Sequence, residues 1–247
     1  MRVRVSYTKT GKARFVSAID LGRVWERSLR RAELPIAYSE GFSPHPKVSF
    51  PDALPLGYAS TGEYAELAFE GRIDLPAGVR ALNAAFPDGV RVLHAVEVAQ
   101  GDPRLSRWLS ASLWELRYDP EVAATLQVTA PELLRADELF VDRDRKGELT
   151  RLDLRPSIHA LATARGTLTI VLHHTEPPMR PSEVHQALAT RAPGALPDPV
   201  LVTRLAQGRA EPHGLLEALS GRLELCGANA SPSIDPSDPE NERVTIP

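Results

Sequence analysis

Residues 3–35 read VRVSYTKTGKARFVSAIDLGRVWERSLRRAELP, and this stretch decides how the chain begins to fold. The first five of these residues alternate apolar and polar side chains, which predicts a β-strand. After Gly11, Ser17 has the position of a helix N-cap, and Asp20 three residues later can serve as the acid of a capping box. We therefore expect a strand followed by a helix that begins just after Ser17.

The helix is expected to continue to the proline that follows it. Residues 21–32 place a mostly apolar face at helical spacing. Pro35 ends the helix, because the residue before a proline is pushed out of the α region. Ile36 then begins a second strand, and residues 48–50 are able to continue it after a stretch rich in Gly and Pro.

Residues 1–100 together predict a β-α-β-β-α-β order. Residues 63–69 and 90–98 indicate the third and fourth strands, and residues 75–86 indicate a second helix with Pro76 in its first turn. This order is the signature of a ferredoxin-like fold.

A similar order is expected in residues 108–209, after a linker at 101–107. Residues 155–164 fit more than one kind of structure. The other expected elements are strands at 113–118, 139–141, 152–154, 168–173 and 200–205, two helical stretches between 120 and 136 around Pro131, and a helix at 181–190. The sequence thus predicts an α+β protein with two tandem ferredoxin-like domains.

Residues 210–247 are expected to form a flexible, disordered tail. One short helix is indicated at 215–219, and a run rich in Ser, Pro and Asp follows that cannot bury enough apolar surface to order itself. Cys226 lies in this tail and is expected to be neither a metal ligand nor a nucleophile.

Composition favours a cytoplasmic protein. No run of about 18 apolar residues is present, so no membrane span is expected. The start of the chain lacks the apolar stretch of a signal peptide. Cys226 is the single cysteine, so an internal disulfide is excluded.

Charge is distributed unevenly along the 247 residues. The net charge is −3, but residues 1–50 hold ten Lys and Arg against four Asp and Glu, a net charge of +6. A basic start on an acidic remainder is typical of a chain that attracts a polyanion locally.

The basic residues of the first helix are candidates for RNA binding. Arg23, Arg27, Arg30 and Arg31 share one helix face, and a guanidinium group matches the geometry of a phosphate. The alternative is an ordinary solvated helix face. Further lysines and arginines lie nearby in the sequence and favour binding: Lys9, Lys12, Arg14 and Lys47.

Residues 39–47 form the most unusual stretch, SEGFSPHPK. Two prolines flank His45 and stiffen its backbone. His45 could donate a proton, stack on a base or contact a phosphate. The alternative is a rigid turn with an inert histidine.

Other polar residues have weaker support. Glu63 could pair with the basic loop or be an exposed edge charge, and Asp153 with Arg155 could form a polar site or plain surface. His173 and His174 are adjacent on a strand and point to opposite faces, so they chelate a metal poorly. No metal site and no cofactor is expected, because the sequence lacks the usual zinc, cluster and nucleotide motifs.

The stretch from Tyr7 to Tyr64 resembles a known family, the radical-SAM-associated family of unknown function. The residues that carry the resemblance are Tyr7-Thr8-Lys9 with Gly11, Arg14-Phe15, Asp20-Leu21, Trp25-Glu26-Arg27, Leu29-Arg30-Arg31-Ala32, Leu34-Pro35, Ala37-Tyr38-Ser39-Glu40-Gly41-Phe42, Pro44-His45-Pro46-Lys47, Pro55-Leu56-Gly57 and Gly62-Glu63-Tyr64. Weaker similarity extends to about residue 205, with the landmarks Asp153-Leu154-Arg155 and Thr203-Arg204.

The resemblance implies a partner, a separately encoded radical SAM protein with a cobalamin-type domain. Members of the family often have Ser-His-Leu-Asp where this chain has Ser17-Ala18-Ile19-Asp20. The missing histidine argues against an obligatory catalytic role for that position.

Three functions are compatible with these features. The first is a non-catalytic RNA-binding or substrate-presenting accessory protein for the radical SAM enzyme. The second is a metal-independent ribonuclease or RNA-modifying enzyme that uses His45, with Tyr7, Tyr38 or Glu40 as a second acid or base. Its architecture would be similar to that of the RNA-processing proteins of CRISPR systems, although fold does not determine function. The third is a protein-binding adaptor without nucleic acid.

Overall fold

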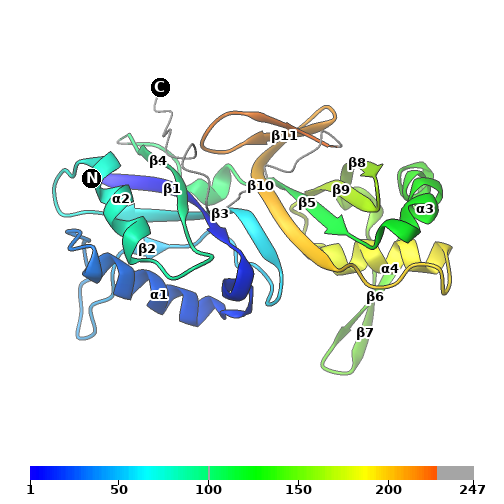
Figure 1. Cartoon of the computed structure of the whole chain (residues 1–247), viewed down its shortest axis with the longest axis horizontal. Helices are drawn as coiled ribbons and strands as arrows, with labels where there is room; N and C mark the ends of the chain where they lie inside the picture. Colours follow the sequence, from blue (N-terminus) through cyan, green and yellow to red (C-terminus); the bar gives the residue numbers. More distant parts are fainter. Residues whose placement is uncertain (100, 227–247) are drawn as a thin grey trace. The chain divides into compact units, whose positions relative to one another are not determined.

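The computed structural model describes residues 1–99 and 101–226. It is an α+β structure with four α-helices among these residues (Figure 1). The described residues divide into two compact units, residues 1–107 (unit 1) and residues 108–226 (unit 2). Among them, no helix is both long enough and apolar enough to cross a membrane.

Unit 1 is an antiparallel sheet with two α-helices against it. Strand β1 pairs with both β3 and β4, and β3 also pairs with β2, so the strand order is β4-β1-β3-β2. The elements are β1 (Arg2–Lys9), the 3₁₀ turn η1 (Gly11–Phe15), α1 (Ala18–Arg31), β2 (Val48–Ser49), β3 (Ala59–Ala68), α2 (Leu75–Ala85), β4 (Val92–Glu97) and η2 (Leu105–Arg107).

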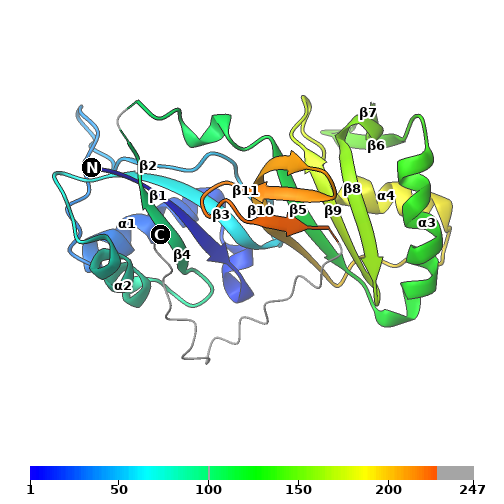
Figure 2. The ribbon, with the colours of Figure 1, turned by 90° about the horizontal axis from the view of Figure 1, so that it is seen from above.

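The core of unit 1 lies between the sheet and the two helices, which run side by side (Figures 1 and 2). Alternate residues of β1, Val3, Val5 and Tyr7, point into this core. The ring of Trp25 from α1 packs edge-on against that of Tyr7, with the ring centroids 5.0 Å apart. The intervening residues of β1 therefore face the other side of the sheet.

Unit 2 also contains an antiparallel sheet, in the order β10-β5-β9-β8. The hairpin β6-β7 lies between α3 and β8 in the sequence, and β11 and β12 extend the sheet beyond β10. The elements are β5 (Ala111–Arg117), η3 (Pro120–Val122), α3 (Ala123–Arg135), β6 (Phe140–Arg145), β7 (Glu148–Asp153), η4 (Arg155–Ser157), β8 (Ile158–Ala164), β9 (Thr167–His173), α4 (Pro181–Arg191), β10 (Leu201–Glu211), β11 (Gly214–Glu217) and β12 (Leu223–Leu225).

Apolar residues of β9 alternate between the two faces of this sheet. Leu168, Ile170 and Leu172 are buried, and α3 packs beside β8 and β9 (Figure 2). Val171 points the other way, into a second cluster with Leu215 from β11. The alternation explains why the run Thr-Ile-Val-Leu is buried along its whole length.

The structure differs from the sequence-based expectation at residues 36–38 and in the helical region before residue 136. Residues 36–38 make isolated bridges to Phe69 and Pro46 rather than a strand. The helical region 123–135 is one helix that contains Pro131, where two stretches were expected. Buried Leu126 and Leu133 keep this helix packed despite the backbone hydrogen bond that Pro131 cannot donate.

The expectation of a tail from residue 210 is wrong for residues 210–226. The predicted helix at 215–219 is instead the strand β11 followed by a turn, because Leu215 is buried against the sheet and β10 supplies a strand partner. Gly208 allows this close pairing, since a Cβ there would lie 1.9 Å from the carbonyl oxygen of Leu216. Residues 227–247 lie outside the described residues.

Cys226 is half-buried rather than at a frayed end. Its Sγ donates to the carbonyl oxygen of Thr169 at 3.2 Å. Burial raises the pKa of the Cys226 thiol, which lowers the fraction of reactive thiolate at neutral pH.

Candidate functional site

Helix α1 begins where the sequence predicts. The backbone N–H of Asp20 donates to Oγ of the N-cap Ser17 at 3.1 Å, and the Ser17 hydroxyl donates to Oδ2 of Asp20 at 2.8 Å. The carboxylate of Asp20 therefore stabilises the N-cap through the hydrogen bond that it accepts from the Ser17 hydroxyl. Hydrogen bonds from Ser17 and then Arg23 lower the pKa of Asp20.

The four arginines of α1 are exposed on the side away from the core. Arg23 pairs with Asp20 at 2.9 Å and Arg30 pairs with Glu26 at 3.0 Å. Nη1 of Arg31 donates to the carbonyl oxygen of Ala85, at the end of α2, at 3.5 Å. These exposed pairs are weak, because water screens the charges. The arginines thus remain able to exchange their partners for phosphate groups.

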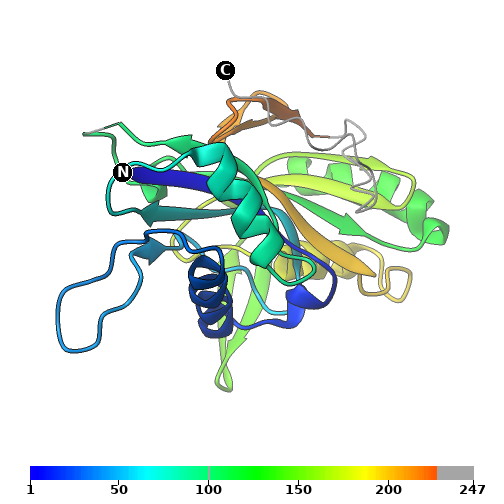
Figure 3. The ribbon, with the colours of Figure 1, turned by 60° about the vertical axis from the view of Figure 1, so that its left-hand side comes forward.

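The segment between α1 and β2 projects as a long loop (Figure 3). Its base is closed by backbone hydrogen bonds from Ser39 to His45 at 2.8 Å and from Lys47 to Ala37 at 2.7 Å. The backbone N–H of His45 also donates to Oγ of Ser39 at 3.0 Å. His45 is therefore held at the base of the loop with its side chain exposed, while Phe42 near the tip is fully exposed.

The predicted residues do not all meet in one place. Arg14 lies in η1, where its guanidinium stacks over the ring of Phe15 at 5.0 Å. Within the described residues, no ion pair or hydrogen bond joins the side chain of His45 or Lys47 to the arginines of α1. Lys47 lies instead at a groove that the sequence did not reveal.

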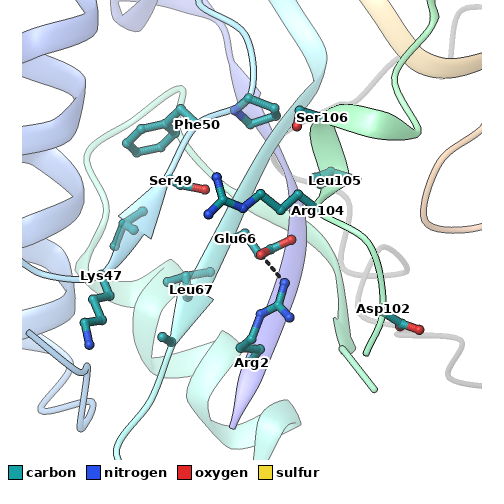
Figure 4. A pocket seen from close by; sticks show the side chains of 13 residues that line it. Arg2, Lys47, Ser49, Phe50, Glu66, Leu67, Asp102, Arg104, Leu105 and Ser106 are labelled. Carbon is teal, nitrogen blue, oxygen red and sulfur yellow. Dashed lines mark hydrogen bonds and ion pairs between the residues drawn. The ribbon is translucent and has the colours of Figure 1, made fainter. Parts of the chain in front are cut away.

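This groove has a volume of about 780 Å³ and lies within unit 1 (Figure 4). It is lined by residues of β1, β2 and β3, by the residues next to β2, and by η2 with the segment before it. The lining residues are Arg2, Lys47, Val48, Ser49, Phe50, Pro51, Glu66, Leu67, Ala68, Asp102, Arg104, Leu105 and Ser106.

Two arginines hold the carboxylate of Glu66, which lines the groove. Glu66 of β3 accepts from Nη2 of Arg2 at 2.5 Å and from Nε of Arg4 at 3.0 Å. Burial alone would raise the pKa of Glu66, but the hydrogen bonds from the two arginines outweigh it, so the pKa is lowered. Arg4 also donates to the carbonyl oxygen of Pro103 and thereby ties residues 102–106 to the sheet.

The signal for this groove was present in β1. Arg2 and Arg4 alternate with the core residues Val3 and Val5, so both arginines must face the same side of the sheet. Glu66 and Arg104 are more than 60 and 100 residues away from Arg2 in the sequence. Local patterns cannot bring such distant residues together, which is why the groove was missed.

Several polar residues that were candidates from the sequence have structural partners. Oδ1 of Asp153 accepts the backbone N–H groups of Leu139 and Arg155 at 2.8 and 3.0 Å. Both ring nitrogens of His174 are engaged, Nε2 with Oγ of Ser112 at 2.6 Å and Nδ1 with the carbonyl oxygen of Leu109 at 2.8 Å.

Two residues that the sequence offered as partners, Glu63 for the basic loop and Tyr7 for His45, are buried. Glu63 is 2% exposed, so the interpretation as an exposed edge charge is wrong. Tyr7 packs in the core and is not at the surface beside His45. In the described part of the chain, no group of three or more His, Cys, Asp and Glu side chains is arranged to hold a metal ion.

Comparison with protein-family models matches most of the chain. The model of a family described as an uncharacterized protein conserved in bacteria (DUF2344) matches residues 2–196. No curated protein matches the chain at a significant level.

Proposed function

We propose that this chain, which belongs to the family of uncharacterized proteins conserved in bacteria (DUF2344), is an RNA-binding or substrate-presenting accessory protein. The observation that carries the proposal is the exposed row of arginines on α1. Arginine binds phosphate through two parallel N–H donors, and RNA offers a phosphate at every nucleotide. The weak pairing of these arginines leaves them available to such a ligand.

The fold is compatible with this role. We propose that both units are ferredoxin-like, because each has an antiparallel sheet in which the first strand lies between the last strand and the third. In unit 2, the hairpin β6-β7 would be an insertion before the second strand. Four-stranded sheets of this kind bind single-stranded RNA in other proteins, although that similarity is an analogy.

The proposed partner is a separate radical SAM enzyme. This part of the proposal rests on the resemblance of Tyr7–Tyr64 described above. It fits the single cysteine, because an iron–sulfur cluster is normally held by several cysteine thiolates. The partner enzyme would supply the cluster chemistry while this chain holds the substrate.

A catalytic role for His45 is the second candidate. The side chain is exposed and its backbone is held by hydrogen bonds to Ser39, so a substrate can reach the imidazole at a fixed position. Tyr7 is unsuitable as its partner because it is buried in the core. RNA cleavage that persists in EDTA and is abolished by His45→Ala would support this candidate over a purely binding role.

The proposal is tested by measuring RNA affinity at several salt concentrations. Each phosphate contact releases counterions, so Arg27→Ala/Arg30→Ala should reduce the slope of log K against log salt by roughly 1 to 2. Arg72→Ala/Arg80→Ala is a matched control, because it removes two exposed arginines of unit 1 that lie outside α1. The control should retain the slope of the unsubstituted protein.

His45→Ala provides a third comparison. This variant removes an imidazole ring and no arginine or lysine, so it should weaken binding with little change in slope. Equal slopes for the α1 variant, the control and the unsubstituted protein, or no RNA binding even at low salt, would instead favour a protein-binding adaptor.

A further inference from the structure

The groove of unit 1 carries more positive than negative charge that is free to act on a ligand. The carboxylate of Glu66 is already neutralised by Arg2 and Arg4. Oδ2 of exposed Asp102 accepts the backbone N–H of Ala99 at 3.2 Å, and this carboxylate contributes one negative charge to the groove. By contrast, the side chains of Lys47 and Arg104 have no hydrogen-bond or ion-pair partner in the part of the chain that the structure describes.

The neutral polar residues that line the groove also favour an oxyanion. The hydroxyl groups of Ser49 and Ser106 line the same groove and can donate hydrogen bonds. Arginine and serine together are able to surround a phosphate with charged and neutral donors. A volume of about 780 Å³ falls within the range that holds small ligands or part of a larger one.

The groove is also partly organised before any ligand binds. Arg4 is buried, and its side chain bridges the carboxylate of Glu66 and the carbonyl oxygen of Pro103. Arg104 directly follows Pro103, so this bridge fixes the backbone from which Arg104 reaches the groove (Figure 4). A fixed backbone reduces the entropy that is lost when a ligand is bound.

We propose that this groove is a phosphate-binding subsite in which Arg104 and Lys47 supply the charge and Ser49 and Ser106 supply neutral donors. The inference rests on the proposed function, because it assigns the backbone phosphates of RNA as the ligand. A phosphorylated small molecule offers the same chemistry. The groove lies on the face of the sheet opposite α1, so it is a site distinct from the arginines of that helix.

The test measures binding of three probes to the full chain: a fluorescently labelled 12-nucleotide RNA, 5′-AMP and inorganic phosphate. The variant is Lys47→Ala/Arg104→Ala. Arg107→Ala is the control, since Arg107 is exposed near Arg104 but does not line the groove. Thermal unfolding of each variant verifies that it remains folded.

The groove variant should bind RNA roughly tenfold more weakly, with a salt slope reduced by about 1 to 2, and Arg107→Ala should change the affinity less than about twofold. Loss of 5′-AMP or phosphate binding in the groove variant, with RNA binding unchanged, would retain the subsite but assign it to a small phosphorylated ligand and overturn the RNA assignment.

The remaining outcomes separate the two proposals. If Arg27→Ala/Arg30→Ala weakens RNA binding while the groove variant binds all three probes like the unsubstituted protein, the subsite is overturned and the proposed function survives. If the unsubstituted protein binds none of the probes at low salt, both proposals are overturned.

Discussion

The guanidinium group of Arg155 donates hydrogen bonds to three backbone carbonyl groups of unit 2. Nε donates to the carbonyl oxygen of Ala136 at 3.0 Å, Nη2 to that of Leu134 at 3.2 Å and Nη1 to that of Ile158 at 3.1 Å. The first two carbonyls lie at the end of α3, where backbone acceptors lack helical partners. Arg155 therefore links the end of α3 to the start of β8.

Arg155→Ala should destabilise the protein by about 3 kcal/mol, because three partly buried carbonyl groups lose a charged donor. Arg155→Lys should lose part of this stability, since one ammonium group cannot reproduce the planar fork. Urea unfolding measures both. Arg135→Ala, at an exposed position at the end of α3, is the control and should change stability by less than about 0.5 kcal/mol. A loss of stability in Arg155→Ala no larger than that in Arg135→Ala would contradict this stabilising role of Arg155.

At the scale of elements, adjacent strands β8 and β9 bring two histidines together. The rings of His159 and His173 lie edge to face, with their centroids 4.9 Å apart. Burial, followed by the charges of His159 and His174, lowers the pKa of His173. The folded protein thus favours the neutral form of His173 more strongly than the unfolded chain does.

This arrangement predicts acid sensitivity. A histidine whose pKa is lowered by folding contributes stability above its unfolded pKa of about 6.5, and this contribution is lost as the pH falls below that value. His173→Gln should therefore show a smaller loss of unfolding free energy between pH 7.5 and pH 5 than the unsubstituted protein. His94→Gln, an exposed position in unit 1, should retain the original pH dependence. If the unfolding free energy of all three proteins has the same pH dependence, His173 does not contribute to the loss of stability in acid.

At the scale of the molecule, the two units carry opposite charge. Residues 1–107 contain fifteen Lys and Arg and twelve Asp and Glu, a net charge of +3. Residues 108–226 contain thirteen and sixteen, a net charge of −3. Both candidate surfaces, the α1 arginines and the groove, belong to the positive unit. The net charge of unit 2 repels a polyanion on average.

Amide hydrogen exchange in the presence of RNA should therefore show new protection in residues 1–107 and little in residues 108–226. The expected segments are α1, the loop that carries His45 and the residues that line the groove. An uncharged polymer at the same concentration controls for crowding. Protection concentrated in unit 2 would contradict the assignment of RNA binding to unit 1.

Local chemistry determined much of this protein from the sequence alone. Ser17 and Asp20 set the start of α1, and the alternation of Val3, Val5 and Tyr7 set the core face of β1. These features depend on residues within a few positions of one another, so propensity and periodicity are sufficient to predict them. The α+β class and the order of the main elements of unit 1 follow from the same local patterns.

Tertiary structure decided the rest. Residues 214–217 became a strand because β10 supplied hydrogen-bond partners and a buried place for Leu215, which outweighed the local preference for a helix. The groove exists because folding places Arg2, Glu66 and Arg104 together, and the role of Arg155 depends on where α3 ends. Contacts between residues so far apart in the sequence are created by the pairing of strands and the packing of helices, and no local pattern encodes them.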